Sequence, residues 1–370
     1  MKIASLRWTT YRLPFRAPYV TAHGAVTYRE GLIIELTADS GLAGLGEAAP
    51  VPEADVSGDA LSRTLATLAP RLLRRQPNDF DVKALLDSDE AGRALACAVD
   101  TAACDLLARH RGVSVARLLS PNAAAAVAVN ALVTAPSAEE AVRAAAEARV
   151  AGFGAVKLKV GTAASLDEER RRVAAVRGAL GPDVKLRLDA NGAWGVDQAI
   201  ETIQALEPFD IQYVEQPIAP GNLESLRRVQ DAVATPVAAD EDVTSPEAAR
   251  RLLDAGAAHV LVLKPQRLGG LRPSREVIDA ATAAGVKVVV TTSIESGVGT
   301  AACLHLAASL PDVGRAHGLA TLDLLEDDLI LDSGLPIVKG CMRLPEGPGL
   351  GVRLDEAALA RYSDGWREAG

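Results

Sequence analysis

The stretch that decides the fold is VKLRLDANGAWGVDQAIETIQALEPFDIQYVEQP, residues 184–217. A short apolar run, a helical segment and a second apolar run follow one another, which is typical of a parallel βαβ unit. Similar runs recur on both sides, at residues 126–133, 155–160, 235–241, 259–265 and 286–293, with a weak eighth at 315–320. Eight such units predict an α/β fold of the (β/α)8 TIM-barrel type, and the weak eighth run leaves a (β/α)7β variant open.

The first 120 residues follow a different pattern. Strand-like stretches cover residues 3–13 and 32–38, a turn follows at 39–41, and a Gly-rich strand leads to Glu47. Helical segments come next, the last over residues 90–111. We therefore predict an α+β capping domain at 1–120, the barrel at 121–335, and a segment at 336–370 that returns to the capping domain.

Composition narrows the class of protein. The 370 residues are 49% hydrophobic and 24% charged, with a net charge of −9, which argues against nonspecific nucleic-acid or anionic-membrane binding. The four cysteines form no metal-finger spacing, and we expect Cys97 and Cys104 to be packed in a helix. No signal-peptide pattern or membrane-spanning run is present, so we expect a cytoplasmic protein. The sequence leaves a homo-oligomer open.

Charged residues end five consecutive predicted strands. They are Lys157 with Lys159, Asp189, Glu215, Asp240 and Lys264, spaced 24 to 30 residues apart from Lys159 onward. Strands buried on both faces are normally apolar, so each charge needs a reason. The spacing places them side by side at the C-terminal mouth of the barrel, where barrel enzymes carry their chemistry.

The three carboxylates favour a metal site. A single carboxylate after a strand is commonly a helix N-cap, and that alternative applies to each position alone. Three on adjacent strands would repel one another unless a cation neutralised them. Oxygen ligands without Cys or His suit Mg²⁺ first and Mn²⁺ second.

The lysines complete a candidate proton-transfer site. Lys157 and Lys159 point the same way because a strand repeats every two residues. We expect burial, the neighbouring ammonium of Lys157 and the metal to favour the neutral amine of Lys159, the form that acts as a base. Lys264 enters from the far side and either binds substrate or pairs with a carboxylate. Together these groups could hold a carboxylate substrate while its α-carbon becomes carbanionic.

The ordered motifs KLK, LDANGAW, VEQP, ADE and LKP resemble those of the muconate-lactonising subgroup of the enolase superfamily, and the resemblance covers essentially the whole chain. It implies that Asp189, Glu215 and Asp240 bind Mg²⁺ and that Lys159 and Lys264 flank the substrate. It also implies that residues 17–27, with Gly24 as a hinge, and the loop after Glu47 close over the site.

The choice of reaction depends on the last two strands. Residues 291–302, TTSIESGVGTAA, and 316–329, AHGLATLDLLEDDL, look most like o-succinylbenzoate synthase, a dehydratase of menaquinone biosynthesis. Dipeptide epimerases usually carry an Asp-x-Asp pair at the eighth strand to hold an ammonium, whereas Gly318, Leu319 and Ala320 stand here. We expect Asp327 and Asp328 to belong to a solvated helix face. Dipeptide epimerase, N-succinylamino acid racemase and muconate cycloisomerase remain alternatives.

Several further residues are candidates for support or substrate contact. Ser293, Ser296 and Gly297 are small groups suited to bind a carboxylate or carbonyl, and Gly318 lies on the eighth strand. Glu295 either orders the seventh-strand loop or contacts substrate, with order favoured. Asn191 and Glu241 are supporting residues, and we expect the Glu241 side chain to point to the face opposite Asp240. We expect His317 to be bound by backbone groups and not to act as a base.

Two other classes of protein compete with this interpretation. A barrel aldolase with a lysine Schiff base needs one desolvated lysine but no three carboxylates in series. A metal-binding barrel without activity would usually have lost a lysine or a ligand, and neither loss is visible. The expected partner is therefore a small-molecule carboxylate.

Overall fold

A long antiparallel sheet forms one side of the molecule. The computed structural model describes residues 1–21, 24–54, 56–80, 89–135, 137–312, 314–331 and 335–369. The sheet has the order β14-β1-β2-β3, with β1 at Ile3–Thr21, β2 at Gly24–Ala38, β3 at Ala43–Ala48 and β14 at Arg367–Ala369. Strands β1 and β2 are longer than the sequence indicates, since they extend through most of residues 17–27 as a paired hairpin. Residues 22–23 at its tip lie outside the described part of the chain.

Helices α1 (Gly58–Leu72) and α2 (Glu90–Arg111) pack against this sheet, and α3 (Val115–Leu119) packs against α2. Short 3-10 turns occur at η1 (Pro52–Ala54) and η2 (Pro77–Asp79). Helix α2 has the predicted bounds because the Asp89 side chain accepts from Gly92 N and the left-handed Gly112 ends it. The glycines of β3 let α2 approach: a Cβ on Gly46 would lie 2.0 Å from the carbonyl oxygen of Ala98.

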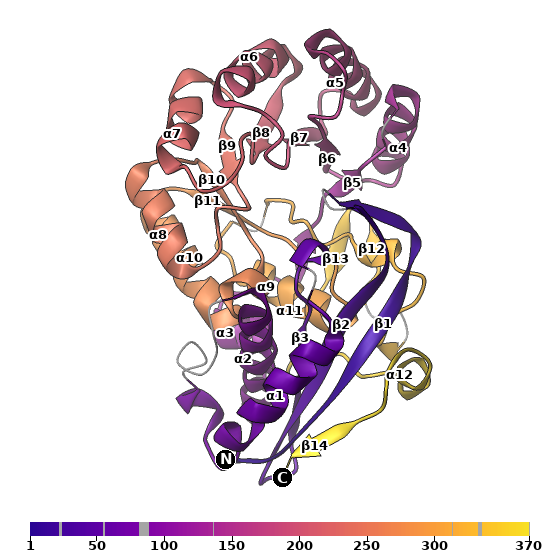
Figure 1. Cartoon of the computed structure of the whole chain (residues 1–370), viewed down its shortest axis with the longest axis vertical. Coiled ribbons are helices and arrows are strands. Elements are labelled where there is room, and N and C mark those ends of the chain that lie inside the picture. The colour runs from indigo at the N-terminus through magenta and orange to yellow at the C-terminus, as the bar shows by residue number, and fades with distance from the viewer. Residues whose placement is uncertain are drawn as a thin grey trace.

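Seven parallel strands and their helices form the barrel (Figure 1). In sheet order the strands are β5 (Ala131–Val133), β6 (Ala155–Lys159), β7 (Lys185–Asp189), β8 (Ile211–Glu215), β9 (Val237–Ala239), β10 (Val260–Leu263) and β11 (Lys287–Val290). The helices are α4 (Ala138–Val150), α5 (Leu166–Leu180), α6 (Val196–Leu206), α7 (Leu223–Ala232), α8 (Pro246–Ala255), α9 (Pro265–Leu268), α10 (Leu271–Ala283) and α11 (Gly297–Ala308), with η3 at Glu207–Phe209. The predicted α/β barrel is confirmed.

The eighth strand position of the barrel is closed by isolated β-bridges. His317 bridges Val129 and Gly318 bridges Thr291, both in parallel, so the weak run at 315–320 closes the ring between β11 and the first strand. After it, the described chain forms only the 3-10 turn η4 (Leu322–Leu324) before it reaches the C-terminal segment. The barrel therefore has the (β/α)7β form.

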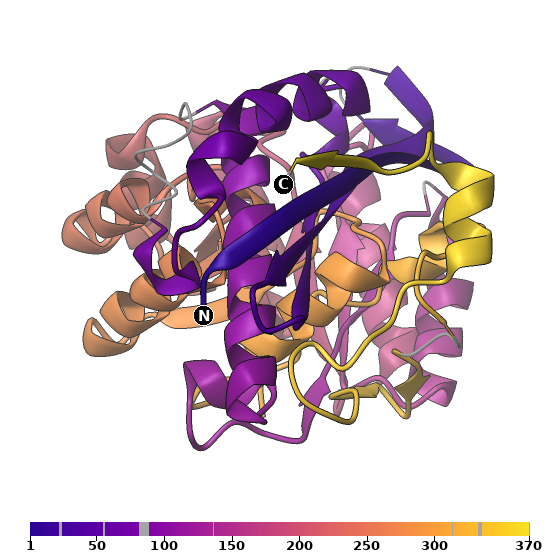
Figure 2. The same ribbon diagram turned by 90° about the horizontal axis from the view of Figure 1, so that it is seen from below.

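The C-terminal segment lies first beside the barrel and then against the capping sheet. Strand β13 (Cys341–Arg343) pairs with β4 (Ala126–Ala128) on one side and with β12 (Ile337–Val338) on the other. Helix α12 (Glu356–Tyr362), absent from the sequence expectation, leads to β14, which pairs with β1. Figure 2 shows this yellow segment beside the indigo strand. The domain limits drawn from the sequence remain predictions.

Two large apolar clusters form the core. One lies in the barrel and its helices, and the other lies between the capping sheet and α1 and α2. Cys97 and Cys104 are buried, as predicted, and all four cysteines are free thiols. Among the described helices, none combines the length and apolar character that a membrane crossing needs.

Candidate active site

The strand-end charges meet at the C-terminal mouth of the barrel. Lys159 pairs with Asp189 across β6 and β7, and Asp189 pairs with Glu215 across β7 and β8. Asp240 and Lys264 directly follow β9 and β10, the next strands in the sheet. The three carboxylates are buried, each no more than 2% exposed. Adjacent strands thus bring together residues far apart in the sequence.

Lysines neutralise the carboxylates. Lys157 Nζ lies 2.9 Å from Asp189 Oδ2 and 2.6 Å from Glu215 Oε1. Lys264 Nζ donates to Asp240 Oδ2, and Arg267 Nη1 lies 3.5 Å from Asp240 Oδ1. Burial lowers the pKa of Lys157, whereas the negative charges of Asp189 and Glu215 raise it. The net result is a raised pKa.

Unpartnered oxygens in this cluster are atoms that a cation could take as ligands. Glu215 Oε2, Asp240 Oδ1 and Glu241 Oε2 are buried without a hydrogen-bond partner among the described residues, which is costly unless a ligand takes them. Burial, with the charges of Asp189 and Asp240, raises the pKa of Glu215 to about 8. As the side chains stand, no three His, Cys, Asp or Glu groups of the described residues are arranged to hold a metal; lysine ammonium groups contact the carboxylates instead.

The opposite shift occurs at Asp240. Burial acts against ionisation there, but Lys264 and Arg267 lower the pKa of Asp240 to about 2. Burial and neighbouring carboxylates thus raise the pKa of Glu215, whereas two cations lower that of Asp240. A hard divalent ion with oxygen ligands is the chemistry that this donor set fits.

Asn191 links the base candidate to the acidic cluster. Its backbone is left-handed, with φ of 44°, and its Oδ1 accepts from Lys159 Nζ at 2.6 Å. Its Nδ2 donates to Glu241 Oε1 at 3.1 Å. The expected orientation of Glu241 is wrong: its side chain faces Asn191 because β9 ends at Ala239, so strand alternation does not extend to residue 241.

The seventh-strand residues form a buried loop against the capping domain. Glu295 is fully buried and its Oε2 accepts from Ser293 N at 2.6 Å, while Glu295 Oε1 and Ser293 Oγ have no hydrogen-bond partner within the part of the chain that the structure describes. Burial, and next the charge of Glu47, raise the pKa of Glu295 to about 7. Ser296 is the N-cap of α11. At Gly318 a Cβ would lie 2.4 Å from Thr291 Oγ1.

Glu47 is a buried carboxyl that the sequence did not single out. Its Oε1 accepts from Tyr11 Oη at 2.5 Å and from Ser296 N at 2.8 Å, and its Oε2 accepts from Ser296 Oγ at 2.6 Å and Gly299 N at 2.7 Å. The capping sheet thus binds the first turn of α11. Its position at the end of a Gly-rich strand was the only sequence signal.

Tyr19 of the capping hairpin lies close enough to the barrel mouth for the charges there to act on it. Burial and the charge of Glu53 raise the pKa of Tyr19 to about 12, and the charges of Lys157, Asp189 and Asp240 act on it as well. Its ring stacks on Phe15, with centroids 5.5 Å apart. Tyr19 lies within residues 17–27, the segment expected to cover the site.

Asp327 and Asp328 are not on a helix face, contrary to expectation. Asp328 accepts from Gly297 N and Leu329 N, both at 2.7 Å, and burial raises its pKa to about 6. Asp327 pairs with Arg361 of α12 at 2.9 Å. The segment is irregular because Asp328 binds the start of α11.

His317 is buried in the barrel seam. Its Nδ1 accepts from Val290 N at 3.0 Å, and burial, with the charge of Arg187, lowers its pKa to about 3. Its ring is therefore neutral and bound to the backbone, as expected of a structural residue.

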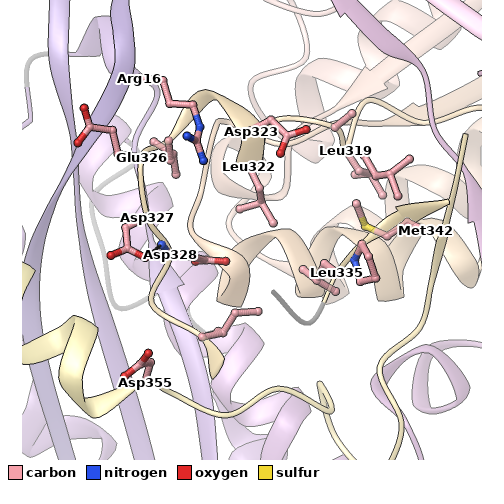
Figure 3. A pocket seen from close by; sticks show the side chains of 15 residues that line it. Arg16, Leu319, Leu322, Asp323, Glu326, Asp327, Asp328, Leu335, Met342 and Asp355 are labelled. Atoms are coloured by element: carbon pink, nitrogen blue, oxygen red, sulfur yellow. Dashed lines mark hydrogen bonds between the residues drawn. The ribbon is translucent and has the colours of Figure 1, made fainter. Parts of the chain in front are cut away.

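A separate pocket of about 520 Å³ adjoins the segment that follows the eighth strand (Figure 3). Arg16, Asp323, Asp328 and Met342 are among the side chains around it, with none of the lysines or carboxylates of the barrel mouth. This pocket is therefore separate from the candidate site at the barrel mouth.

Family models match most of the chain. The enolase C-terminal domain-like model covers residues 140–358, and the mandelate racemase / muconate lactonizing enzyme N-terminal domain model covers residues 4–120. The chain belongs to the mandelate racemase and muconate lactonizing enzyme family of the enolase superfamily. It is thus an enzyme, a lyase or isomerase, that abstracts the proton alpha to a carboxylate.

Relatives differ in reaction. An o-succinylbenzoate synthase of Thermobifida fusca is 44% identical over 214 residues, 57% of this chain and 64% of that protein. The L-Ala-D/L-Glu epimerase of Bacillus subtilis is 30% identical over 95% of this chain and 97% of its own, and its substrate-liganded structure gives a TM-score of 0.87 at 95% and 99% coverage.

A third relative is a solved metal complex. The dipeptide epimerase of Enterococcus faecalis, complexed with Mg and L-Leu-L-Tyr, is 27% identical, with a TM-score of 0.86 and coverage of 95% and 99%. The fold and family are therefore shared, while these relatives carry out different reactions.

Proposed function

We propose that this enzyme uses Mg²⁺ to dehydrate 2-succinyl-6-hydroxy-2,4-cyclohexadiene-1-carboxylate to o-succinylbenzoate. The observation that carries the proposal is the lack of an acidic pair at the eighth strand. Gly318 and Ala320 stand where epimerases usually carry Asp-x-Asp, and Thr291 fills the space that a side chain at 318 would need. A substrate without an ammonium group suits this mouth better. The relationship to the Thermobifida fusca synthase supports the same choice.

Asp189, Glu215 and Asp240 would hold the metal, whose charge would offset the negative charge of the substrate carboxylate and its enediolate. Mg²⁺ is favoured by the oxygen-only donor set and is present in the Enterococcus faecalis complex; Mn²⁺ is the second choice.

The two lysines have different roles in the proposed reaction. Lys159 on β6 and Lys264 after β10 lie on strands separated by three others, so they approach the mouth from different sides. Lys159 removes the α-proton, and the C–H electrons pass into an enediolate that the ammonium of Lys264 stabilises. The Lys159 ammonium then returns its proton to the departing hydroxyl on the same face. Water leaves, and the new double bond makes the ring aromatic.

The decisive test is a steady-state assay of the purified enzyme with Mg²⁺ on several substrates in parallel. The panel contains the cyclohexadiene, L,L- and L,D-dipeptides, N-succinylamino acids and cis,cis-muconate. We expect the cyclohexadiene to give the highest kcat/KM. A dipeptide processed with a far higher kcat/KM would overturn the synthase assignment and leave the metal and lysine roles intact.

Isotope exchange separates dehydration from epimerisation. An epimerase needs both lysines as alternating acid and base on opposite faces, whereas dehydration needs proton transfer from Lys159 alone. We expect no exchange of solvent deuterium into dipeptides or N-succinylamino acids. Exchange that Lys159→Ala retains for one enantiomer only would favour epimerase or racemase chemistry.

A further inference from the structure

A buried ion pair lies behind Lys159, on the helix that follows its strand. Glu169 and Arg172 are one turn apart on α5, 4% and 5% exposed, with Arg172 Nη1 3.1 Å from Glu169 Oε1. Burying two charges costs free energy that their attraction offsets only when further hydrogen bonds complete the pair. The partners of those further bonds show what the pair does.

Both side chains bind the backbone around Lys159. Arg172 Nη1 donates to the carbonyl oxygen of Lys159 at 2.9 Å, and its Nη2 donates to that of Ala135 at 2.7 Å. Glu169 Oε2 accepts from Gly161 N at 2.7 Å. The pair therefore holds the chain immediately before and after Val160, and joins it to the segment that follows the first barrel strand.

The sheet ladder holds this backbone only as far as Val160: Lys159 pairs with Asp189, and Val160 N donates to the carbonyl oxygen of Asp189. Strand β6 ends at Lys159, so the sheet ladder no longer fixes the turn beyond Val160. Gly161 has φ of 88°, and a Cβ there would lie 2.7 Å from the Cβ of Ala193. The Lys159 side chain is 32% exposed and its Nζ donates to Asn191 Oδ1 at 2.6 Å, so its direction depends on that hydrogen bond and on the backbone from which it starts.

We propose that Glu169 and Arg172 are positioning residues that aim Lys159 at the substrate. The proposal rests on the proposed role of Lys159 as the base. The pair sets the main-chain orientation on both sides of Lys159 and hence the path of its ammonium group across the mouth. A base displaced by about 1 Å can cost roughly 10²-fold in rate without weakening substrate binding equally.

The same helix provides a matched control. Arg177 also binds main-chain carbonyls, those of Phe209, Gly181, Val184 and Asp210, at 2.8 to 2.9 Å. These contacts lie toward the start of β7 and the start of β8, away from the strand ends that carry the site. Loss of Arg177 should therefore weaken the packing of α5 without moving Lys159.

The kinetic test compares Arg172→Gln, Arg172→Lys and Glu169→Gln with Arg177→Gln, on the panel substrate with the highest kcat/KM. We expect Arg172→Gln to lower kcat about 10²-fold with KM changed less than about threefold. The primary isotope effect on kcat with α-deuterated substrate should rise, and Arg172→Lys should recover part of the rate. Arg177→Gln should lower Tm comparably and keep kcat. Equal kcat losses in Arg172→Gln and Arg177→Gln would overturn the proposal.

Two measurements need no substrate. Hydrogen–deuterium exchange at the Gly161 amide should accelerate in Glu169→Gln and Arg172→Gln but not in Arg177→Gln. The acetylation rate of Lys159 by acetic anhydride, relative to the exposed Lys185, should change in the same two variants. A wild-type enzyme inert on the whole panel would refute the proposed function alone. Unchanged exchange and acetylation in both variants would refute the positioning role, whatever the substrate is.

Discussion

The pKa values of single residues at the barrel mouth are explained by the groups around them. Glu215 and Asp240 lie on adjacent strands, yet the pKa of one is raised to about 8 and that of the other lowered to about 2. Lys157 is shared by two carboxylates, whereas Lys264 and Arg267 both act on Asp240. A divalent cation would therefore compete with the lysines for carboxylate oxygens, and metal binding would free the ammonium groups for substrate.

This competition predicts the effect of removing one ligand. Glu215→Gln keeps the size of the side chain but removes its charge, so we expect Mg²⁺ affinity to fall at least tenfold and turnover to be lost. Asp189→Asn and Asp240→Asn should behave alike, and the barrel should stay folded. Isothermal titration with Mg²⁺, circular dichroism and the activity assay check this. Asp197→Asn, on the exposed face of α6, is the control; near-normal metal affinity in Glu215→Gln would refute the assignment.

The buried Glu295 predicts a pH-dependent stability. Because its folded pKa is raised from 4.5 to about 7, its contribution is fully present below pH 4.5 and is lost as pH rises through 7. The difference corresponds to about 3 kcal/mol. Glu295→Gln avoids this loss, so its stability relative to wild type should increase by about that amount between pH 4.5 and 8, measured by urea unfolding.

The same variant decides the role of Glu295. Normal turnover in Glu295→Gln would show that Glu295 serves to order the seventh-strand loop. Loss of turnover in a folded protein would show that it contacts the substrate. A stability difference that does not vary with pH would contradict the burial argument. Glu35→Gln, at the partly exposed pair with Arg7, provides the comparison.

Site residues were predictable from sequence where strand geometry alone sets their position. Parallel strands align their C-terminal ends, so Lys157, Asp189 and Glu215 lie together at the mouth of the barrel. Glu241 was placed wrongly because it lies just beyond the strand, where alternation no longer applies. Glu47 and Asp328 could not be identified, because their partners lie 249 and 31 residues away and no local pattern encodes such contacts.

At the scale of elements, the start of α11 joins three parts of the chain. Its first turn receives Glu47 from β3 and Asp328 from the segment after the eighth strand, and Ser296 caps it. Carboxylates near a helix N-terminus are stabilised by its unpaired N–H groups. The eighth strand was the weakest element in the sequence. In the structure it consists of the two bridges at His317 and Gly318, and backbone hydrogen bonds join it to its neighbours on both sides.

The start of α11 supports a stability prediction. In Glu47→Gln the new amide group must face either Gly299 N or Ser296 N, both donors, so one buried N–H loses its acceptor. We expect a loss of about 3 kcal/mol, since each hydrogen bond to a charged group contributes about 1.5–3 kcal/mol. Glu35→Gln, at a partly exposed ion pair in the same sheet, should cost less than about 1 kcal/mol. Equal losses in the two variants by urea unfolding would contradict the role of Glu47.

Over the whole molecule, α2 ties the capping sheet to the barrel. Asp100 accepts from Leu271 N and Arg272 N at the start of α10, and Asp105 accepts from Leu45 N and Leu350 N. The alternating pattern predicted the barrel because each unit is local in sequence. The predicted return of the C-terminal segment to the capping domain is confirmed by the pairing of β14 with β1. The alternating pattern could not give helix α12 or the register of β14, whose partners lie at the other end of the chain.

The return of the chain to β1 predicts what deletion of residues 364–370 does. The deletion removes the pairing of β14 with Leu6–Trp8, the hydrogen bond from Thr10 Oγ1 to Asp364 at 2.9 Å, and the packing of Arg7 on Trp366. All three metal candidates lie in the barrel, so Mg²⁺ affinity should stay within about twofold of wild type. The capping sheet carries Tyr19 over the mouth, so KM should rise and Tm should fall by several degrees.

Titration calorimetry, thermal unfolding and steady-state kinetics separate these effects. Arg7→Gln in the full-length chain is the control, because it removes the packing on Trp366 and keeps the strand pairing; it should lower Tm less than the deletion and keep KM. In this division of labour the barrel would hold the metal and the capping sheet would order the substrate. A deletion variant that loses Mg²⁺ affinity together with KM would show that the capping sheet shapes the carboxylate cluster itself, and the division would then be wrong.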